Sequence, residues 1–276
     1  MKRIWLASFL MLAACSSLLY YPRKEQFVNP KKVKLDPEDI YFQNKENQKL
    51  HGWWFASKKT PVKGTFVFFH GNGENLSTHF LALQWLPDAG YNYFIFDYPG
   101  YGQSEGDPSP YLNVISGQAA LQWVHDHKDP SPLIVYGQSM GGIVAMRTAI
   151  EEKDHTPMKV VIADGTFSSF QRIGRKKMAQ HWLTWLFQPF AYIALSDKWA
   201  PDVEKISPIP LIVMHGRQDK VVEFEHGERV FQEAKEPKVF IEVPDGHHGD
   251  LFWVDEGKYR QIVLDKIDEM AKFYQR

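Results

Sequence analysis

The stretch Gly137-Gln-Ser-Met-Gly141 decides the fold. It follows the apolar run 133–136, which is typical of a buried strand, and it opens a helical pattern that continues to residue 150. A serine at such a strand-to-helix turn has a strained backbone, and the turn lifts its Oγ clear of the sheet. Glycine is expected at 137 and 141 because side chains there would collide. The stretch predicts a nucleophile at Ser139.

Outward from this motif, apolar runs alternate with segments of helical spacing. Short apolar runs of this kind are typical of parallel strands buried on both faces, and the segments between them place helices on both faces of the sheet. Eight strands are predicted, over 39–43, 49–56, 64–69, 91–96, 133–136, 160–163, 211–214 and 239–243, the first two as an antiparallel hairpin. Helices are predicted over 76–86, 114–124, 140–150, 224–234 and 259–273.

One connection interrupts the alternation. Residues 165–208 lie between two predicted strands, and ordinary connections are far shorter. Their middle, 182–195, is dense in aromatic and aliphatic side chains. One interpretation is an extra helix packed on the core, and the other is a lid over an active site. We expect a helical lid insertion with an apolar acyl group beneath residues 182–195.

A serine hydroxyl needs a general base that is itself oriented by an acid. The loops that follow parallel strands meet at one edge of the sheet, so the partners of Ser139 should follow later strands. Asp219 follows the strand 211–214, and two adjacent histidines, His247 and His248, follow the strand 239–243. The sequence therefore predicts Ser139, Asp219 and one of these two histidines as a catalytic triad.

Other acidic residues compete with Asp219. Asp164 also ends a strand, but it precedes the long insertion, and Asp245 and Asp250 are expected to orient the histidine loop. The same two acids and two histidines could instead bind a metal. Adjacent histidines point apart, however, and a further ligand at helical spacing is not evident. We expect neither a metal nor a cofactor.

The oxyanion of an acyl transfer needs two N–H donors that are already aimed at it. The backbone N–H of Met140 is one by its position next to the nucleophile. The loop after the strand 64–69 should supply the other, and we expect it from Asn72, with Gly71 and Gly73 letting the backbone turn inward. A dinucleotide-binding motif would need a third glycine where Leu76 stands. The later run 97–104 is expected to form a tight structural loop.

The N-terminus is typical of an export signal. Two basic residues precede an apolar run, 4–14, that is too short to span a bilayer comfortably. Leu12-Ala-Ala-Cys15 resembles the bacterial lipobox, which implies cleavage before Cys15 and lipid attachment to its sulfur. An uncleaved anchor extending through Tyr21 and a buried N-terminal helix are the alternatives. We expect a signal peptide over 1–14, a lipid-attached, partly basic tether over 15–37 and one domain over 38–276, anchored in a bacterial cell envelope.

The composition limits the classes of partner. The 276 residues are 44% hydrophobic and 24% charged, which is too apolar for a disordered chain. Lys and Arg number 32 against 33 Asp and Glu, so the net charge is −1 and argues against nucleic acid as a partner. The single cysteine excludes an intrachain disulfide and a cysteine-based zinc site.

With these residues placed, the chain resembles the α/β-hydrolase-fold serine hydrolases, in particular depalmitoylase-like and serine aminopeptidase-like members in bacterial lipoprotein form. Five segments carry the resemblance, at 70–77, 97–104, 136–142, 215–219 and 246–250. Members usually show Gly-His-Asn-Asp in the last segment. Matching that Asp to Asp250 implies His248 as the base, although His247 is an extra histidine at this place.

The resemblance implies hydrolysis of an ester, thioester or amide without a cofactor. We expect a serine hydrolase that cleaves a carboxylic ester or thioester of a small-molecule or acylated substrate through an acyl-Ser139 intermediate. An aminopeptidase-like amidase with the same triad is one alternative. A non-catalytic binding lipoprotein on the same fold is the other, but such a protein would be expected to have lost part of the triad.

Overall fold

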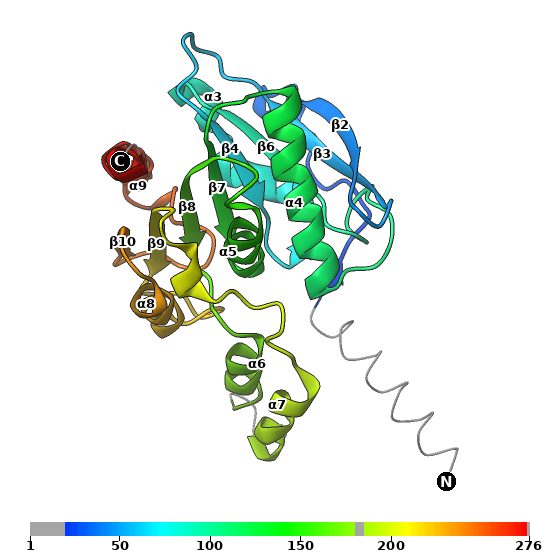
Figure 1. Cartoon of the computed structure of the whole chain (residues 1–276), viewed down its shortest axis with the longest axis vertical. Helices are drawn as coiled ribbons and strands as arrows, with labels where there is room; N and C mark the ends of the chain where they lie inside the picture. The colour runs from blue at the N-terminus through cyan, green and yellow to red at the C-terminus, as the bar shows by residue number, and fades with distance from the viewer. Residues whose placement is uncertain (1–19, 180–184, 275–276) are drawn as a thin grey trace.

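Eight strands form one mostly parallel sheet in the computed structural model, which describes residues 20–179 and 185–274 (Figure 1). The strand order is β10-β9-β8-β7-β4-β6-β3-β2, and β3 runs antiparallel to both of its neighbours. All eight predicted strands are confirmed. Their bounds are β2 (Glu38–Gln43), β3 (Lys49–Phe55), β4 (Thr65–Phe69), β6 (Asn92–Phe96), β7 (Leu133–Gln138), β8 (Met158–Asp164), β9 (Leu211–Gly216) and β10 (Lys238–Val243).

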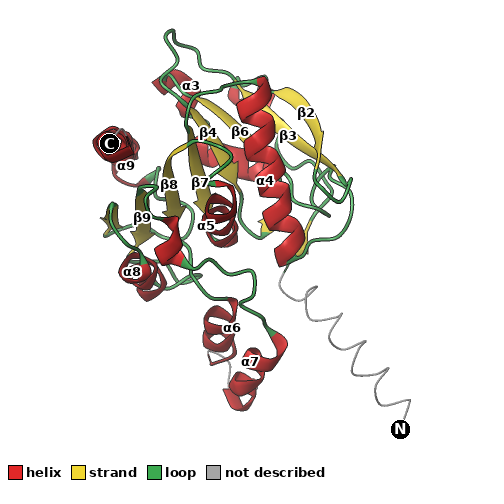
Figure 2. Ribbon diagram, in the orientation of Figure 1, coloured by secondary structure: helices red, strands yellow, loops and turns green. Residues whose placement is uncertain are grey.

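Helices cover both faces of this sheet (Figure 2). One core contains side chains of α4 (Pro110–His127), α5 (Met140–Glu152) and α8 (Phe224–Glu233). The other contains side chains of α2 (Leu76–His79), α3 (Leu86–Ala89) and α9 (Lys258–Tyr274). The period of two along a strand builds both cores at once. In β4, Phe66 and Phe68 face the second core, whereas Val67 and Phe69 face the first.

The predicted helix over 76–86 is wrong as a single element. The chain forms three short pieces there, α2, the 3-10 turn η2 (Phe80–Leu83) and α3. Pro87 lies in the first turn of α3. Proline is favoured in the first turn of a helix, where its missing N–H would have had no acceptor, so Pro87 accounts for a new helix beginning at Leu86, at the end of the predicted range. Two further 3-10 turns are η1 (Pro30–Val33) and η5 (Val254–Gly257).

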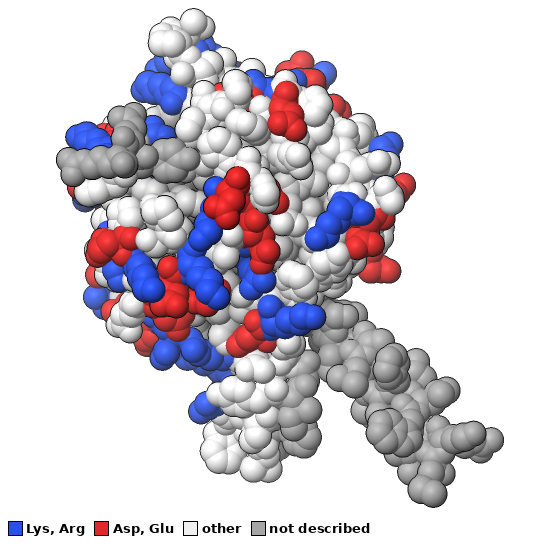
Figure 3. Space-filling model, in the orientation of Figure 1, with Lys and Arg blue, Asp and Glu red and all other residues white. Residues whose placement is uncertain are grey.

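The long connection after β8 forms a helical lobe, seen at the bottom of Figure 1. Its described elements are α6 (Phe170–Ala179), η3 (Trp185–Phe190), α7 (Ala191–Ala194) and η4 (Val203–Ile206), while residues 182–184 of the aromatic segment lie outside the described residues. Trp185, Leu186 and Tyr192 are exposed. The far end of the lobe is mostly free of charged side chains in Figure 3. The connection is helical as predicted, and its role as a lid stays a prediction.

A second, two-stranded sheet was not expected from the sequence. In it β1 (Tyr21–Pro22) pairs in parallel with β5 (Gly73–Glu74). Residues of the predicted tether therefore lie against the domain, and the division of the chain at residues 14 and 37 stays a prediction. The predicted signal peptide and Cys15 lie outside the described residues. Within 20–179 and 185–274, the longest helices are too short or too polar to cross a bilayer.

Candidate active site

Ser139 lies at the sharp turn between β7 and α5, with φ 55° and ψ −123°. A side chain at positive φ is strained, and the surroundings must hold it there. The backbone does so, because Ser139 N–H donates to the carbonyl of Asp164 at 2.8 Å. A Cβ on Gly141 would lie 1.9 Å from the carbonyl oxygen of Phe69, and one on Gly137 would lie 2.5 Å from that of Gly141. Both glycines are thus required, as expected, because the backbone passes too close to these positions for a side chain to fit.

His248 and Asp219 are hydrogen-bonded, with 2.7 Å between Nδ1 and Oδ2. The other carboxylate oxygen of Asp219 accepts the N–H groups of Val221 at 2.8 Å and Val222 at 2.9 Å. His215 Nε2 lies 3.5 Å from Oδ2. Burial alone would raise the pKa of Asp219, but the contacts with His215, His248 and Val222 outweigh it and hold this pKa well below its usual range.

Ser139 and His248 line the same cavity, which has a volume of about 460 Å³. This size suits a small ligand or part of a larger one. The remaining lining residues come from the loop after β4, from α2 and η2, from the end of β7, and from the loops after β9 and β10: Gly71, Asn72, Gly73, Glu74, Thr78, His79, Leu81, Ala82, Gln138, Val221, Gly249 and Trp253. A larger hollow of about 940 Å³ lies against β2 and α4 and includes neither Ser139 nor His248.

The two adjacent histidines lie in different surroundings. The His248 side chain is 22% exposed and faces Asp219. The His247 side chain is 64% exposed, its Nδ1 lies 3.4 Å from Asp250 Oδ2, and its backbone N–H donates to Asp250 Oδ1 at 2.7 Å. Asp250 thus shapes the loop through His247. In the described ranges, no three His, Cys, Asp or Glu side chains gather in a way that could hold a metal ion.

Asp164, the competing acid, ends β8 and is fully buried. Its Oδ2 accepts a short hydrogen bond from the hydroxyl of Tyr136, and its Oδ1 has no hydrogen-bond partner. Burial raises the pKa of Asp164 to about 6. No hydrogen bond links this carboxyl group to His248 among the described contacts, whereas the Asp219 carboxylate has one.

The two expected oxyanion donors come from Met140, next to Ser139 in the chain, and from Asn72, which lines the same cavity as Ser139. Met140 is the first residue of α5, and N–H groups in the first turn of a helix have no acceptor within it. Asn72 lines the cavity, and the Tyr101 hydroxyl lies 2.9 Å from both its carbonyl oxygen and its side-chain oxygen. A Cβ on Gly71 would lie 3.1 Å from the His79 ring, so Gly71 permits a close approach. Gly73 has open space around it and no positive φ, contrary to the expected need for glycine there.

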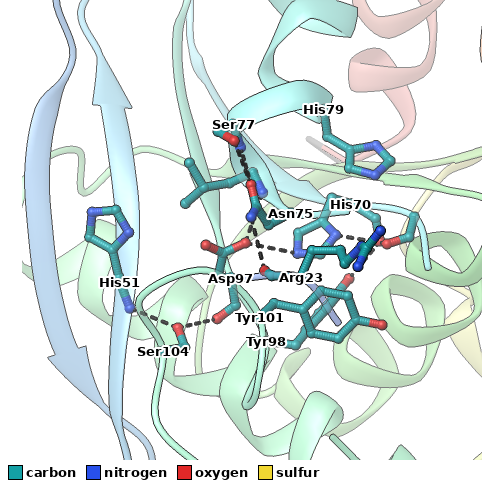
Figure 4. A network of polar contacts seen from close by, with 12 residues as sticks. Arg23, His51, His70, Asn75, Ser77, His79, Asp97, Tyr98, Tyr101 and Ser104 are labelled. Atoms are coloured by element: carbon teal, nitrogen blue, oxygen red, sulfur yellow. Dashed lines mark hydrogen bonds and ion pairs between the residues drawn. The ribbon is translucent and has the colours of Figure 1, made fainter. Parts of the chain in front are cut away.

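The sequence reasoning missed the buried polar network behind this loop (Figure 4). Asp97, just beyond the end of β6, accepts the Leu76 N–H at 2.8 Å and lies 3.4 Å from His70 Nε2. Ser104 Oγ donates to the Asp97 carbonyl at 2.8 Å, and a Cβ on Gly102 would overlap the Asp97 carboxylate. The rule that selected Asp219, an acid in the loop that follows a parallel strand, could also have singled out Asp97.

His79 is the member of this network that reaches the cavity. Its Nε2 lies 2.8 Å from the Gly73 carbonyl, and its ring stacks on His70 with the centroids 5.2 Å apart. Burial, together with the neighbouring His70 ring, lowers the pKa of His79 to about 4. His79 is therefore neutral at pH 7 and holds the loop through a hydrogen bond to its backbone.

Sequence comparison places the chain in a known family. A family model described as serine aminopeptidase, S33, matches residues 60–198, which is half of the chain and includes the Ser139 turn. The uncharacterized protein YfhR of Escherichia coli K12 is 32% identical over 270 residues, covering 94% of this chain and 89% of that protein. The α/β-hydrolase domain-containing protein WAV2 of Arabidopsis thaliana is 26% identical, covering 95% of this chain and 90% of its own.

Comparison of structures agrees on the fold. An esterase of Pyrococcus furiosus superposes with a TM-score of 0.68 at 22% identity, covering 92% of this chain and 97% of the esterase. The sheet order and the helices on both faces are therefore those of an α/β-hydrolase fold. The chain belongs to the serine aminopeptidase S33 family of α/β-hydrolases.

Proposed function

We propose that this protein is a serine hydrolase that cleaves a carboxylic ester or thioester through an acyl-serine intermediate. One observation carries the proposal: Ser139, on a strained turn, lines the same cavity as His248, whose Nδ1 lies 2.7 Å from Asp219 Oδ2. A carboxylate can only accept, so this contact places the proton of the neutral imidazole on Nδ1. His248 Nε2 then has the lone pair that a general base needs.

The chemistry follows from these roles. His248 Nε2 takes the proton of Ser139 as Oγ attacks the carbonyl carbon, and the carbonyl oxygen becomes an oxyanion that accepts from the N–H groups of Met140 and Asn72. His248 next donates this proton to the leaving alcohol or thiol as the bond to the acyl carbon breaks. Water then attacks acyl-Ser139 with His248 as base, which releases the acid and restores the serine.

The lining of the cavity supports an apolar acyl group. Leu81, Ala82, Val221 and Trp253 supply apolar surface beside Ser139. The described residues of the segment 182–195 do not line this cavity. We therefore assign the acyl group to the surface formed by these four residues instead of the aromatic segment. A series of p-nitrophenyl esters from acetate to decanoate tests this, and kcat/KM should rise with chain length before it falls.

The test of the function is labelling with a fluorophosphonate, which reacts with activated serines. We expect stoichiometric labelling of the wild-type protein and none of Ser139→Ala, while the exposed Ser131→Ala variant labels like the wild type. Circular dichroism and thermal melting of each variant check the fold. Labelling that persists in Ser139→Ala, or a folded wild type that does not label, would contradict the proposal. The second result would favour a non-catalytic binding protein.

An aminopeptidase-like amidase is the second candidate. The family name supports it, and Glu74 places a carboxyl group in the cavity lining, where it could pair with a substrate amine. Aminoacyl p-nitroanilides and matched p-nitrophenyl esters distinguish the two reactions. For the amidase, kcat/KM should be higher on the anilides and should fall in Glu74→Gln, whereas the ester hydrolase should be insensitive to this change.

We also propose that Cys15 carries the lipid that anchors the protein in a bacterial cell envelope. The lipobox-like sequence before the single cysteine supports this. Mass spectrometry of the N-terminal peptide should show a diacylglyceryl group on residue 15 and no residue before it. Cys15→Ser should move the protein out of the membrane fraction, and an unmodified Cys15 peptide would contradict the proposal.

A further inference from the structure

Residues 20–27, which we call the strap, lie across the loop that follows β4. Tyr20 is buried at 3% exposure, and β1 within the strap pairs with β5 so that Tyr21 is opposite Gly73. The Tyr21 N–H also donates to the side-chain oxygen of Asn72 at 3.2 Å. The strap is therefore in contact with the part of the loop that lines the cavity.

Asn75 joins the strap to the loop (Figure 4). Its Nδ2 donates to the carbonyls of Arg23 at 2.9 Å and Glu25 at 2.7 Å. Its Oδ1 accepts from Ser77, from the backbone N–H at 2.9 Å and from the hydroxyl at 2.6 Å, and so caps α2. The residue is 2% exposed. Both amide protons and both lone pairs are used, which gives this side chain one orientation.

Further hydrogen bonds connect the strap, the loop after β4 and the segment after β6. Phe27 N–H donates to Ser77 Oγ at 2.9 Å, and Gly102 N–H donates to the Arg23 carbonyl at 2.8 Å. Asp97, in the segment after β6, accepts the Leu76 N–H at 2.8 Å. The loop that carries Asn72 is thus hydrogen-bonded both to the strap and to the segment after β6.

We propose that the strap is a positioning element for hydrolysis, acting through Asn75 to hold the Asn72 N–H where the oxyanion forms. The proposal rests on the proposed function. Donors in an oxyanion hole are effective because they are aimed before the reaction, and loss of one donor costs about 10²–10³-fold in kcat. The loop has glycines on both sides of Asn72, so its backbone needs outside contacts to remain in one conformation.

The variant that tests this proposal is Asn75→Asp, made in the full chain. It retains an oxygen acceptor for Ser77 but places a carboxylate oxygen against the carbonyls of Arg23 and Glu25, which repels the strap. Asn29→Asp is the control, because Asn29 also accepts a local backbone N–H, from Lys31 at 3.0 Å, outside the strap. Ser77→Ala, which removes the bond to Phe27, serves as a milder second variant if Asn75→Asp does not fold.

Two readouts test the proposal. Arg23 and Lys24 make the strap a trypsin site, so its release in Asn75→Asp should speed cleavage there, and amide hydrogen exchange of residues 70–77 should rise. On p-nitrophenyl butyrate, kcat per fluorophosphonate-titrated site should fall about tenfold or more with KM changed less than about threefold. Asn29→Asp should match the wild type in every measurement.

A purely structural role would lower the fraction of titratable sites and leave kcat per site unchanged, and that result would overturn the inference. So would a released strap with unchanged exchange at 70–77. These outcomes differ from failure of the proposed function, in which the wild type itself shows neither Ser139-dependent labelling nor turnover. That result would remove the catalytic role of the strap together with the function.

Discussion

His248 and Asp219 are 29 positions apart in the chain, and their side chains are joined by a hydrogen bond of 2.7 Å. The adjacent His247 takes no part in it, because its ring lies near Asp250 and is largely exposed. The loop after β10 thus gives two neighbouring identical residues different chemical surroundings. One can act as a base held by a carboxylate, and the other stabilises the loop.

This relationship predicts different effects for the two histidines. His248→Gln should lower kcat by at least about 10³-fold, because it removes the proposed base. His247→Gln should lower it by less than about threefold, since only a surface contact is lost. Steady-state kinetics on p-nitrophenyl butyrate, with thermal melting to check the fold, provide the measurement. Comparable losses in both variants would argue against His248 as the base.

Asp164 predicts a particular dependence of stability on pH. Its pKa is raised from 3.8 to about 6 in the folded protein, so unfolding releases a proton between these values and the folded state loses stability as the pH rises through this window. Asp164→Asn does not titrate. Relative to this variant, the wild type should lose about 2 kcal/mol of unfolding free energy between pH 4 and pH 7.

Urea unfolding of both proteins at pH 4, 5, 6 and 7 measures this difference. Using the difference removes the opposing contribution of His79, whose pKa is lowered to about 4. Because of His79, the folded protein loses stability as the pH falls from 6.5, the pKa of an ordinary histidine, toward 4. This loss is the same in the wild type and in the variant. A difference that stays constant with pH would show that Asp164 does not titrate in this window.

Substitution by alanine should have very different effects on stability at two glycines of the site. Gly141→Ala places a Cβ 1.9 Å from the Phe69 carbonyl oxygen, and backbone cannot move away cheaply. We expect a loss of more than about 3 kcal/mol or an insoluble protein. Gly73→Ala meets nothing within 4 Å and should change the unfolding free energy by less than about 0.5 kcal/mol. Urea unfolding measures both free energies. Equal losses in the two variants would contradict the close packing described at the Ser139 turn.

If Cys15 carries a lipid, the rate of hydrolysis of a membrane-embedded substrate should depend on the length of chain between Cys15 and the strap. Cys15 precedes the buried Tyr20 by five residues, a reach of about 18 Å at full extension. A lipid on Cys15 would hold the cavity close to the bilayer. Insertion of about 30 Gly/Ser residues after Ser17 adds roughly 30 Å of reach. In vesicles, this should lower hydrolysis of an embedded long-chain ester several-fold.

A soluble short-chain ester is the control for that insertion, and its rate should be the same with and without the linker. Equal rates on the embedded ester would show that proximity to the membrane does not matter to the reaction. A loss on both substrates would instead indicate that the insertion disturbs the strap. Thermal melting and trypsin cleavage at Arg23 would then check the strap directly.

The sequence by itself determined the sheet and the residues around the serine. Buried parallel strands need continuous apolar runs, and the turn after β7 needs glycine, so both features are local and visible in the chain. The same rule placed Asp219 and the two histidines after strands, because parallel strands bring the following loops to one edge. The division of residues 76–86 into short pieces was not visible, because the helical spacing continues through it and Pro87 lies beyond the predicted range.

Only the tertiary structure decided the contacts between segments far apart in the chain. The position of the two histidines after a strand left both of them open as the base, and the family resemblance alone pointed to His248. Which ring faces Asp219 is settled by the path of the loop after β10. The pairing of β1 with β5 joins two residues from each strand, too short for any periodicity, and is held by backbone groups that every residue has. The role of Asn75 likewise arises from carbonyls 50 and 52 positions away. Such contacts depend on the path of the folded backbone, which residue identity does not specify.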